Sequence, residues 1–226
     1  MNNLSSEERM RRFYRREKID RVPMLSCATM YAGWQKGLTS EEFYFDIEKA
    51  FQAQKDVCEE KGYDDLIEAF AEFYKQNNDW RLLIIGGGSM EEKLKALIEE
   101  KKLQDKVEIT GYIHEVKENL LKGSVFMMTS RWEGFPMTVT EALEMGLPVI
   151  AYDIPAMQPL VTDGVEGRIV PAFERDKLVK AMEELALNSD LRRKMSANAL
   201  AKADTLRPDK VVKQWLFLIK TIVGDR

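Results

Sequence analysis

The sequence predicts an α/β fold in which a doubly wound parallel sheet is covered by helices on both faces. Three observations lead to this prediction. Short apolar runs alternate with amphipathic segments from Trp80 to the C-terminal end. The runs are continuously apolar, which is typical of parallel strands buried on both faces. Glycines follow several of these runs, where a buried strand would turn into a helix.

The expected elements follow one another in a regular order. Leu66, Ala69, Phe70 and Phe73 recur at helical spacing and predict a helix over 64–79. Strands are expected over 80–88, 106–112, 124–130, 147–153 and 166–170. Further helices are expected over 89–103, 114–123, 135–146, 174–189, 190–204 and 207–223. This alternation predicts a Rossmann-like domain, whose ligands bind beyond the carboxyl ends of the strands.

Residues 1–60 read as helix, strand and helix. The first helix, over 5–17, begins a basic stretch in which residues 9–21 hold seven arginines and lysines against two acids. Such a helix could contact a membrane surface or simply present a solvated face, and both interpretations stay open. A short strand is expected over 22–28, followed by a helix from 39 to a glycine stop at 62.

Composition excludes several classes of protein. The net charge of −4 offers no general basic field for nucleic acid. Two cysteines, Cys27 and Cys58, predict neither a disulfide framework nor a zinc site, and His114 is the sole histidine, so no metal is expected. No apolar run approaches the roughly 20 residues of a spanning helix, and no signal peptide opens the chain. A soluble, cytoplasmic protein is the expectation.

The most informative stretch is SRWEGFPMTVTEALEMGLPVIAYD, over 130–153. A strand ends at Ser130, and a helix starts near Met137, so backbone N–H groups of the intervening loop would face the ligand crevice and suit a diphosphate. Glu141 could then accept both hydroxyls of a ribose, and Glu133 could reach a second hydroxyl-rich group. The alternative is that Glu141 merely decorates a helix face.

Two further features have competing interpretations. GGGS at 86–89 resembles a linker or a dinucleotide loop, but no third glycine follows at the fingerprint spacing. A tight turn between strand and helix is therefore the favoured interpretation. His114 is expected near the start of a helix, and a catalytic role for it is disfavoured.

Glu133 and Glu141, with seven residues between them, resemble the paired-glutamate signature of retaining glycosyltransferases built from two Rossmann-like domains (the GT-B fold). The similarity runs from about Lys61 to the C-terminal end and follows the strand and helix order of that family's C-terminal, donor-binding domain. KGYDDLIEAFAEF resembles its first helix, LLIIGGG its second strand and VEITGY its third.

The resemblance implies roles for particular residues. Glu141 would hold the ribose, Glu133 would hold the donor sugar as the catalytic residue, and Lys61 would meet the diphosphate. Gly111 and Tyr112 would lie beside a uracil or guanine base. The backbone that would meet the diphosphate or the sugar is that of Gly134, Phe135, Pro136 and Met137. The resemblance implies a UDP- or GDP-linked sugar as donor substrate, and no cofactor.

Residues 1–63 resemble the start of the uroporphyrinogen decarboxylase superfamily, especially its corrinoid methyltransferase relatives. The resemblance lies in the basic helix, the Asp-Arg-Val-Pro turn and a helix ending in Gly-Tyr-Asp. Sixty residues are too few to close a (β/α)₈ barrel. The chain therefore resembles a chimera, natural or engineered, with one part over 1–60 and a nucleotide-sugar-binding domain over 61–226.

Relative to the glycosyltransferase pattern, the first strand, its diphosphate arginine and the acceptor domain are missing. Residues 22–28 are the best candidate to complete the sheet, and an oligomer or a separate chain could supply the acceptor domain. The function expected is nucleotide-sugar binding without transfer by this chain alone. One alternative is a non-catalytic chimera that folds and binds little, and a corrinoid or methyl-transfer module is a remote third.

Overall fold

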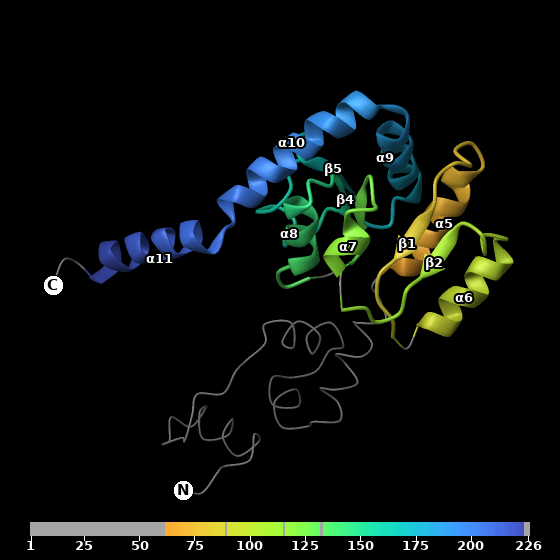
Figure 1. Cartoon of the computed structure of the whole chain (residues 1–226), viewed down its shortest axis with the longest axis horizontal. Coiled ribbons are helices and arrows are strands. Elements are labelled where there is room, and N and C mark those ends of the chain that lie inside the picture. Colours follow the sequence, from red (N-terminus) through yellow and green to blue (C-terminus); the bar gives the residue numbers. More distant parts are fainter. Residues whose placement is uncertain (1–61, 89, 115, 132, 224–226) are drawn as a thin grey trace, which may run out of the picture. The chain divides into compact units, whose positions relative to one another are not determined.

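A computed structural model describes residues 62–88, 90–114, 116–131 and 133–223 (Figure 1). Every helix and strand expected in this part of the chain is present. The helices are α5 (Tyr63–Tyr74), α6 (Glu91–Glu100), α7 (Val116–Leu120), α8 (Met137–Glu144), α9 (Arg175–Leu187), α10 (Ser189–Thr205) and α11 (Pro208–Val223). The strands are β1 (Leu82–Ile84), β2 (Val107–Ile109), β3 (Phe126–Met128), β4 (Val149–Tyr152) and β5 (Gly167–Val170). The predicted α/β class with parallel strands is confirmed.

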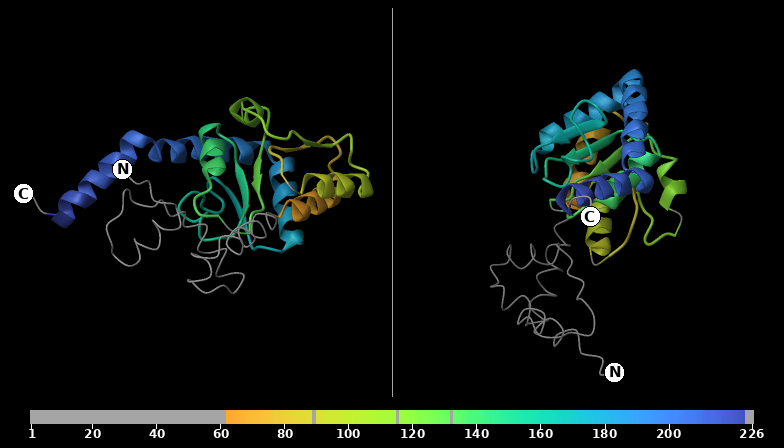
Figure 2. Two further views of the ribbon diagram at one scale, coloured as in Figure 1. Left: turned by 90° about the horizontal axis from the view of Figure 1, so that it is seen from below. Right: turned by 90° about the vertical axis from the view of Figure 1, so that its left-hand side faces the viewer.

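The described strands form two groups. β1 pairs in parallel with β2, and β3, β4 and β5 pair in parallel in that order. Two views turned from that of Figure 1 also show the two groups as distinct (Figure 2). The sequence predicts one sheet, and the difference arises because no described strand lies between β1 and β3.

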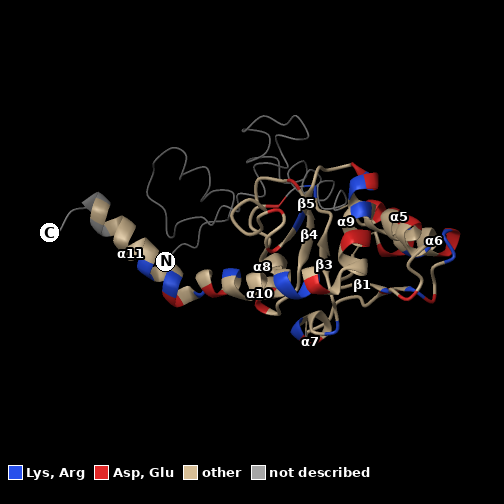
Figure 3. Ribbon diagram, turned by 90° about the horizontal axis from the view of Figure 1, so that it is seen from above, with Lys and Arg blue, Asp and Glu red and all other residues tan. Residues whose placement is uncertain are grey.

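The core forms where helices cover both faces of the strands. All four residues of β4 are buried, as the continuously apolar sequence VIAY requires. Neither β3 nor β4 carries a charged side chain, so both are uniformly tan in Figure 3. α5 buries Leu66, Phe70 and Phe73, and it packs against both α6 and α9. This helix therefore links the β1–β2 group to the β3–β5 group.

The start of α5 is held against the carboxyl end of β3. The Thr129 hydroxyl donates a hydrogen bond of 2.8 Å to the Gly62 carbonyl. Gly62 has a φ of +70°, and a Cβ at this position would lie 2.2 Å from the Thr129 carbonyl oxygen. Only glycine tolerates both the left-handed backbone and this close approach.

α11 differs from the other helices because its apolar side chains, among them Trp215 and Phe217, are exposed. None of the helices in the described part of the chain combines the length and the apolar character that a membrane-spanning helix needs.

Several expectations lie outside the described residues. They are the basic helix over 5–17, the strand over 22–28, the helix from 39 and the position of Lys61. The predicted boundary between residues 60 and 61 is untested and stays a prediction.

We expect Gly167→Ala to lower the free energy of unfolding by at least about 3 kcal/mol, because overpacking here must displace the main chain. A Cβ at Gly167 would lie 1.8 Å from the carbonyl oxygen of Val149, its partner on β4. Urea denaturation measures the change. Gly88→Ala is the control, since a Cβ there meets nothing within 4 Å. Equal midpoints for the two variants would contradict the β4–β5 register.

Candidate functional site

The carboxyl ends of the strands open onto one end of a cavity of about 1010 Å³. At this end the cavity is lined by Gly86, which follows β1, by Tyr112, which follows β2, and by Thr138 and Glu141 of α8. Because the strands are parallel, their carboxyl ends meet at one edge, as expected for a ligand site in this architecture. The structure thus brings Tyr112 and Glu141, two residues predicted from sequence, to the same cavity.

The loop over 130–136 delivers the chain into α8. Pro136 is buried and stands directly before the helix, and the Val139 amide donates to its carbonyl at 3.0 Å. The amides of Met137 and Thr138 have no carbonyl four residues earlier inside the helix. The first turn of α8 carries no acidic side chain. This helix start is therefore electrostatically suited to an anion.

The two predicted carboxylates differ in position. Glu141 lies in the second turn of α8, is half-buried and lines the cavity. Glu133 is also half-buried but lies on the loop and outside the cavity lining. In the described ranges neither carboxylate has a hydrogen-bond or ion-pair partner. Both are available to accept hydrogen bonds from a hydroxyl-rich ligand.

The remaining predicted residues surround the same edge of the strands. Gly134, Phe135 and Met137 are exposed, with 52% of Phe135 and 60% of Met137 accessible. Gly111 has a φ of +67° and forms a bridge to Gly86, which turns the chain after β2. This turn leaves the neighbouring Tyr112 ring 87% exposed beside the cavity.

The two features with competing interpretations are also placed. Residues 86–88 form the connection between β1 and α6, and the Glu91 amide donates to the Gly88 carbonyl at 3.1 Å. The interpretation of GGGS as a turn is confirmed. His114 is exposed and precedes α7 by two residues.

Sequence reasoning missed a polar cluster under this edge, made of Arg131, Asp65, Tyr152 and Phe173. The Arg131 guanidinium lies 3.0 Å from the Asp65 carboxylate and 4.8 Å above the Phe173 ring. The Tyr152 hydroxyl lies 3.4 Å from the same Asp65 oxygen. Arg131 Nε is buried and has no partner in the described part of the chain. The cluster ties the first turn of α5 to the ends of β3 and β4.

The cluster perturbs the titration of its tyrosine. Burial raises the pKa of the Tyr152 phenol to about 12, and the nearby Asp65 charge adds to the effect. The only sequence signals for this cluster were an arginine directly after an apolar strand and an aspartate opening a helix. Neither signal identifies the partner, since 66 positions separate the two residues.

The fold and the helix start at the edge of a parallel sheet define a Rossmann-like, GT-B C-terminal type of domain. Residues 55–202 match the model of the family described as glycosyl transferases group 1. The match covers more than half of the chain, so the chain belongs to the group 1 glycosyltransferase family.

Three known proteins illustrate the similarity. The chain is 32% identical over 145 residues to the alpha-D-kanosaminyltransferase of Streptomyces kanamyceticus, covering 63% of this chain and 38% of that protein. A crystal structure of S. aureus TarM in complex with Fondaparinux, alpha-GlcNAc-glycerol and UDP is 25% identical with a TM-score of 0.66, over 70% of this chain and 33% of that one. The C-terminal domain of the Francisella tularensis group 1 protein LpcC has a TM-score of 0.61 at 22% identity, over 65% of this chain and 80% of that domain.

These comparisons bear on the expected boundaries. The chain spans well under half the length of the full-length relatives, whereas it covers most of the isolated C-terminal domain. The family match begins at residue 55, six residues before the resemblance expected from sequence. The resemblance of residues 1–63 to the decarboxylase superfamily finds no support in them.

We expect Tyr152→Phe to flatten the stability of the protein between pH 10 and pH 12. A phenol whose pKa is raised in the folded state stabilises the fold below its unfolded pKa, near 10, and loses this contribution as the pH rises through about 12. The loss is on the order of 2 kcal/mol. Urea unfolding at stepped pH measures it. Tyr112→Phe, at an exposed ring, should keep the wild-type slope, and equal slopes for all three proteins would refute the assignment.

Proposed function

We propose that residues 61–226 bind a nucleotide diphosphate-sugar as the donor-binding domain of a retaining glycosyltransferase. The observation that carries the proposal is the arrangement at the strand ends: an anion-compatible helix start on α8, with two carboxylates without described partners, Glu133 and Glu141, on either side of it. A nucleotide-sugar has the complementary order of groups, with a ribose diol, a diphosphate and a sugar.

Each part of the donor has a counterpart at this edge. Glu141, facing the cavity, accepts hydrogen bonds from the ribose hydroxyls. The amides at the start of α8 and in the loop before it hold the diphosphate. The base, uracil or guanine, lies against the exposed Tyr112 ring and the turn at Gly111. Glu133 contacts the donor sugar on the far side of the phosphates and is the catalytic residue of the proposal.

Lys61 supplies the positive charge that the diphosphate needs. It precedes Gly62, which is hydrogen-bonded to Thr129 at the carboxyl end of β3. Consecutive Cα atoms are about 3.8 Å apart, so the ammonium group is within reach of this edge. Arg131 does not take over this role, because its guanidinium is engaged by Asp65.

The relatives support a donor with a nucleotide. UDP occupies the TarM structure named above, which is 25% identical to this chain. Transfer from such a donor in this family runs through departure of the nucleoside diphosphate with retention at the anomeric carbon, a step that the diphosphate contacts stabilise.

A second candidate is a chimera that folds without a retained activity. The acidic Glu59 and Glu60 beside Lys61 favour it, because they weaken attraction for phosphate. The origin of residues 1–60 in a decarboxylase-like chain, and contact of their basic helix with a membrane surface, stay hypotheses that rest on the sequence pattern.

We expect Glu141→Ala to weaken binding of UDP or GDP by roughly ten- to a hundred-fold, because one charged hydrogen-bonding group to the ribose is lost. Glu133→Ala should leave the nucleotide affinity unchanged and weaken only the nucleotide-sugar. Isothermal titration calorimetry measures both.

The matched control is Glu144→Ala, one turn along the same helix, where the carboxylate is exposed and pairs with Lys117 at 3.1 Å. Its affinity should equal that of the wild type. Unchanged binding in both Glu141→Ala and Glu133→Ala would contradict the site, whereas no nucleotide binding by the wild-type chain would favour the non-binding candidate.

We also expect the 226-residue chain, assayed by itself, to transfer no sugar. The chain covers 38% of the length of the kanosaminyltransferase, and positioning a second reactant supplies about 7–11 kcal/mol of the barrier reduction in such reactions. A radiolabelled nucleotide-sugar assay tests this. Donor-dependent transfer or hydrolysis that Glu133→Ala abolishes would refute it.

A further inference from the structure

β1 and β3 each have one edge that no described strand covers. β1 pairs only with β2, and on its other side β3 pairs only with β4 within the described ranges. Burial reflects this difference: every residue of β4 is buried, whereas the three residues of β3 are only half-buried. An apolar strand with an unpaired edge is a site for a further strand.

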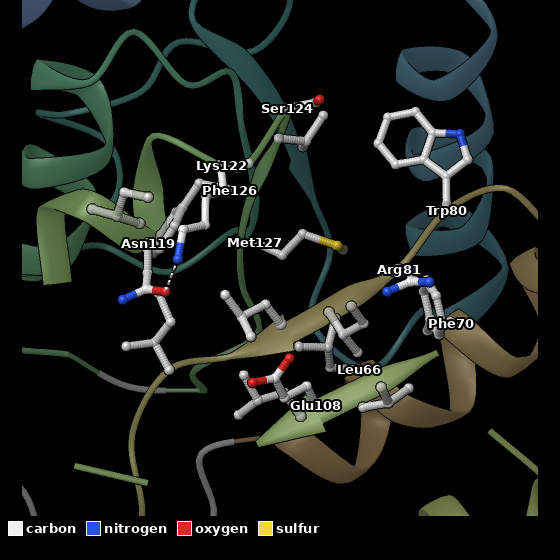
Figure 4. Close-up of a pocket in the computed structure, with 18 of the residues that line it drawn as sticks. Leu66, Phe70, Trp80, Arg81, Glu108, Asn119, Lys122, Ser124, Phe126 and Met127 are labelled. Carbon is white, nitrogen blue, oxygen red and sulfur yellow. Dashed lines mark hydrogen bonds between the residues drawn. The ribbon is translucent and has the colours of Figure 1, made fainter. Parts of the chain in front are cut away.

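The cavity of about 1010 Å³ lies along these two edges. It is lined by residues 81–86 on the β1 side and by residues 125–129 on the β3 side. Leu66 and Phe70 of α5 contribute one wall, and Leu120 of α7 contributes another. Figure 4 shows Met127 of β3 facing the cavity, with Leu66 and Phe70 on α5 across from it.

The walls of the cavity are the four neighbours of a strand inside a layered α/β sheet. Two are strand edges, and two are helices that lie on opposite faces of the strands (Figure 3). The lining is apolar in the middle and polar at its ends, with Arg81 and Asp105 before the strands and Tyr112 and Glu141 after them. A matching occupant is an extended, uncharged segment of five or six residues.

Topology also defines where the occupant belongs in the chain. A strand parallel to β1 and β3 that precedes α5 would connect to β1 through α5 by an ordinary crossover. The occupant is thus expected N-terminal to Gly62. Residues 22–35 form the longest uncharged run in 1–61. Within it, VPMLSCA at 22–28 has a proline only near its start, where strands tolerate it.

We propose that residues 22–28 of this chain fill the cavity as a central parallel strand. The two groups of strands then become one sheet, in the order β2, β1, 22–28, β3, β4, β5. This proposal rests on the fold and is independent of nucleotide binding.

The length of the intervening chain permits this arrangement. The strand would end at the edge where α5 begins, so residues 29–61 must leave that edge and return to it. A loop of about ten residues over 29–38 can span up to ~33 Å. A helix of about twenty residues over 39–58 spans ~30 Å in the return direction.

Another segment of the same region is a weaker occupant. Residues 50–54, AFQAQ, are also uncharged and lie closer to α5. They place Gln52 and Gln54 on one face of a strand, where a helix would bury both amides without partners. A strand from a second copy of the chain is the other competitor.

Thiol reactivity tests the proposal on the full-length chain. In a Cys58→Ser background, Cys27 should react with an alkylating reagent at least roughly a hundred-fold more slowly than in urea, because only local opening exposes it. The control places the single thiol at Ser5 in a Cys27→Ser, Cys58→Ser chain, outside the proposed strand, and should react at the unfolded rate. A native Cys27 thiol as fast as this control would overturn the proposal.

Photo-crosslinking identifies the occupant directly. Trp80, half-buried at one end of the cavity, is replaced by p-benzoylphenylalanine, and Trp215 on the exposed face of α11 is replaced in a control. Crosslinks from position 80 should map to residues 20–28 of the same chain, and those from position 215 should not. Crosslinks from position 80 to residues 50–54, or only to a second copy, would overturn the assignment in favour of that occupant.

Discussion

The attachment of α5 to the carboxyl edge of the strands is the constraint on which the rest of the structure depends. Gly62 approaches the Thr129 carbonyl so closely that no side chain fits, and the Thr129 hydroxyl closes the contact. One turn later Asp65 holds both Arg131 and Tyr152. Because α5 also packs against α6 and α9, this attachment sets the two groups of strands in register with one another.

The candidate site inherits its geometry from that attachment. Arg131 lies directly after β3 and directly before the loop that carries Glu133 into α8. Its contacts with Asp65 and Phe173 hold the base of this loop, while the loop tip at Phe135 stays exposed. A rigid base with accessible amides suits an anion whose contacts are mostly to the backbone. The buried cluster is structural, and the carboxylates without described partners above it are available to a ligand.

The same cavity serves two parts of the molecule. At the strand ends it presents Tyr112 and Glu141, which fit a nucleotide, and along β1 and β3 it presents apolar walls, which fit a strand. Membership of the group 1 glycosyltransferase family accounts for the first part. The second part is particular to this chain, in which the residues before α5 are charged and helical in pattern where the fold needs a buried strand.

The sequence by itself determined every helix and strand from residue 62 onward and the paired glutamates at 133 and 141. These features follow from local periodicity and from short-range motifs, which the order of residues contains directly. Only the tertiary structure decided that Asp65, Arg131 and Tyr152 form one cluster, and that β1 and β3 face a cavity rather than each other. Such contacts join positions more than sixty residues apart, and the energy of a long-range contact depends on the whole packing of the chain rather than on any local pattern.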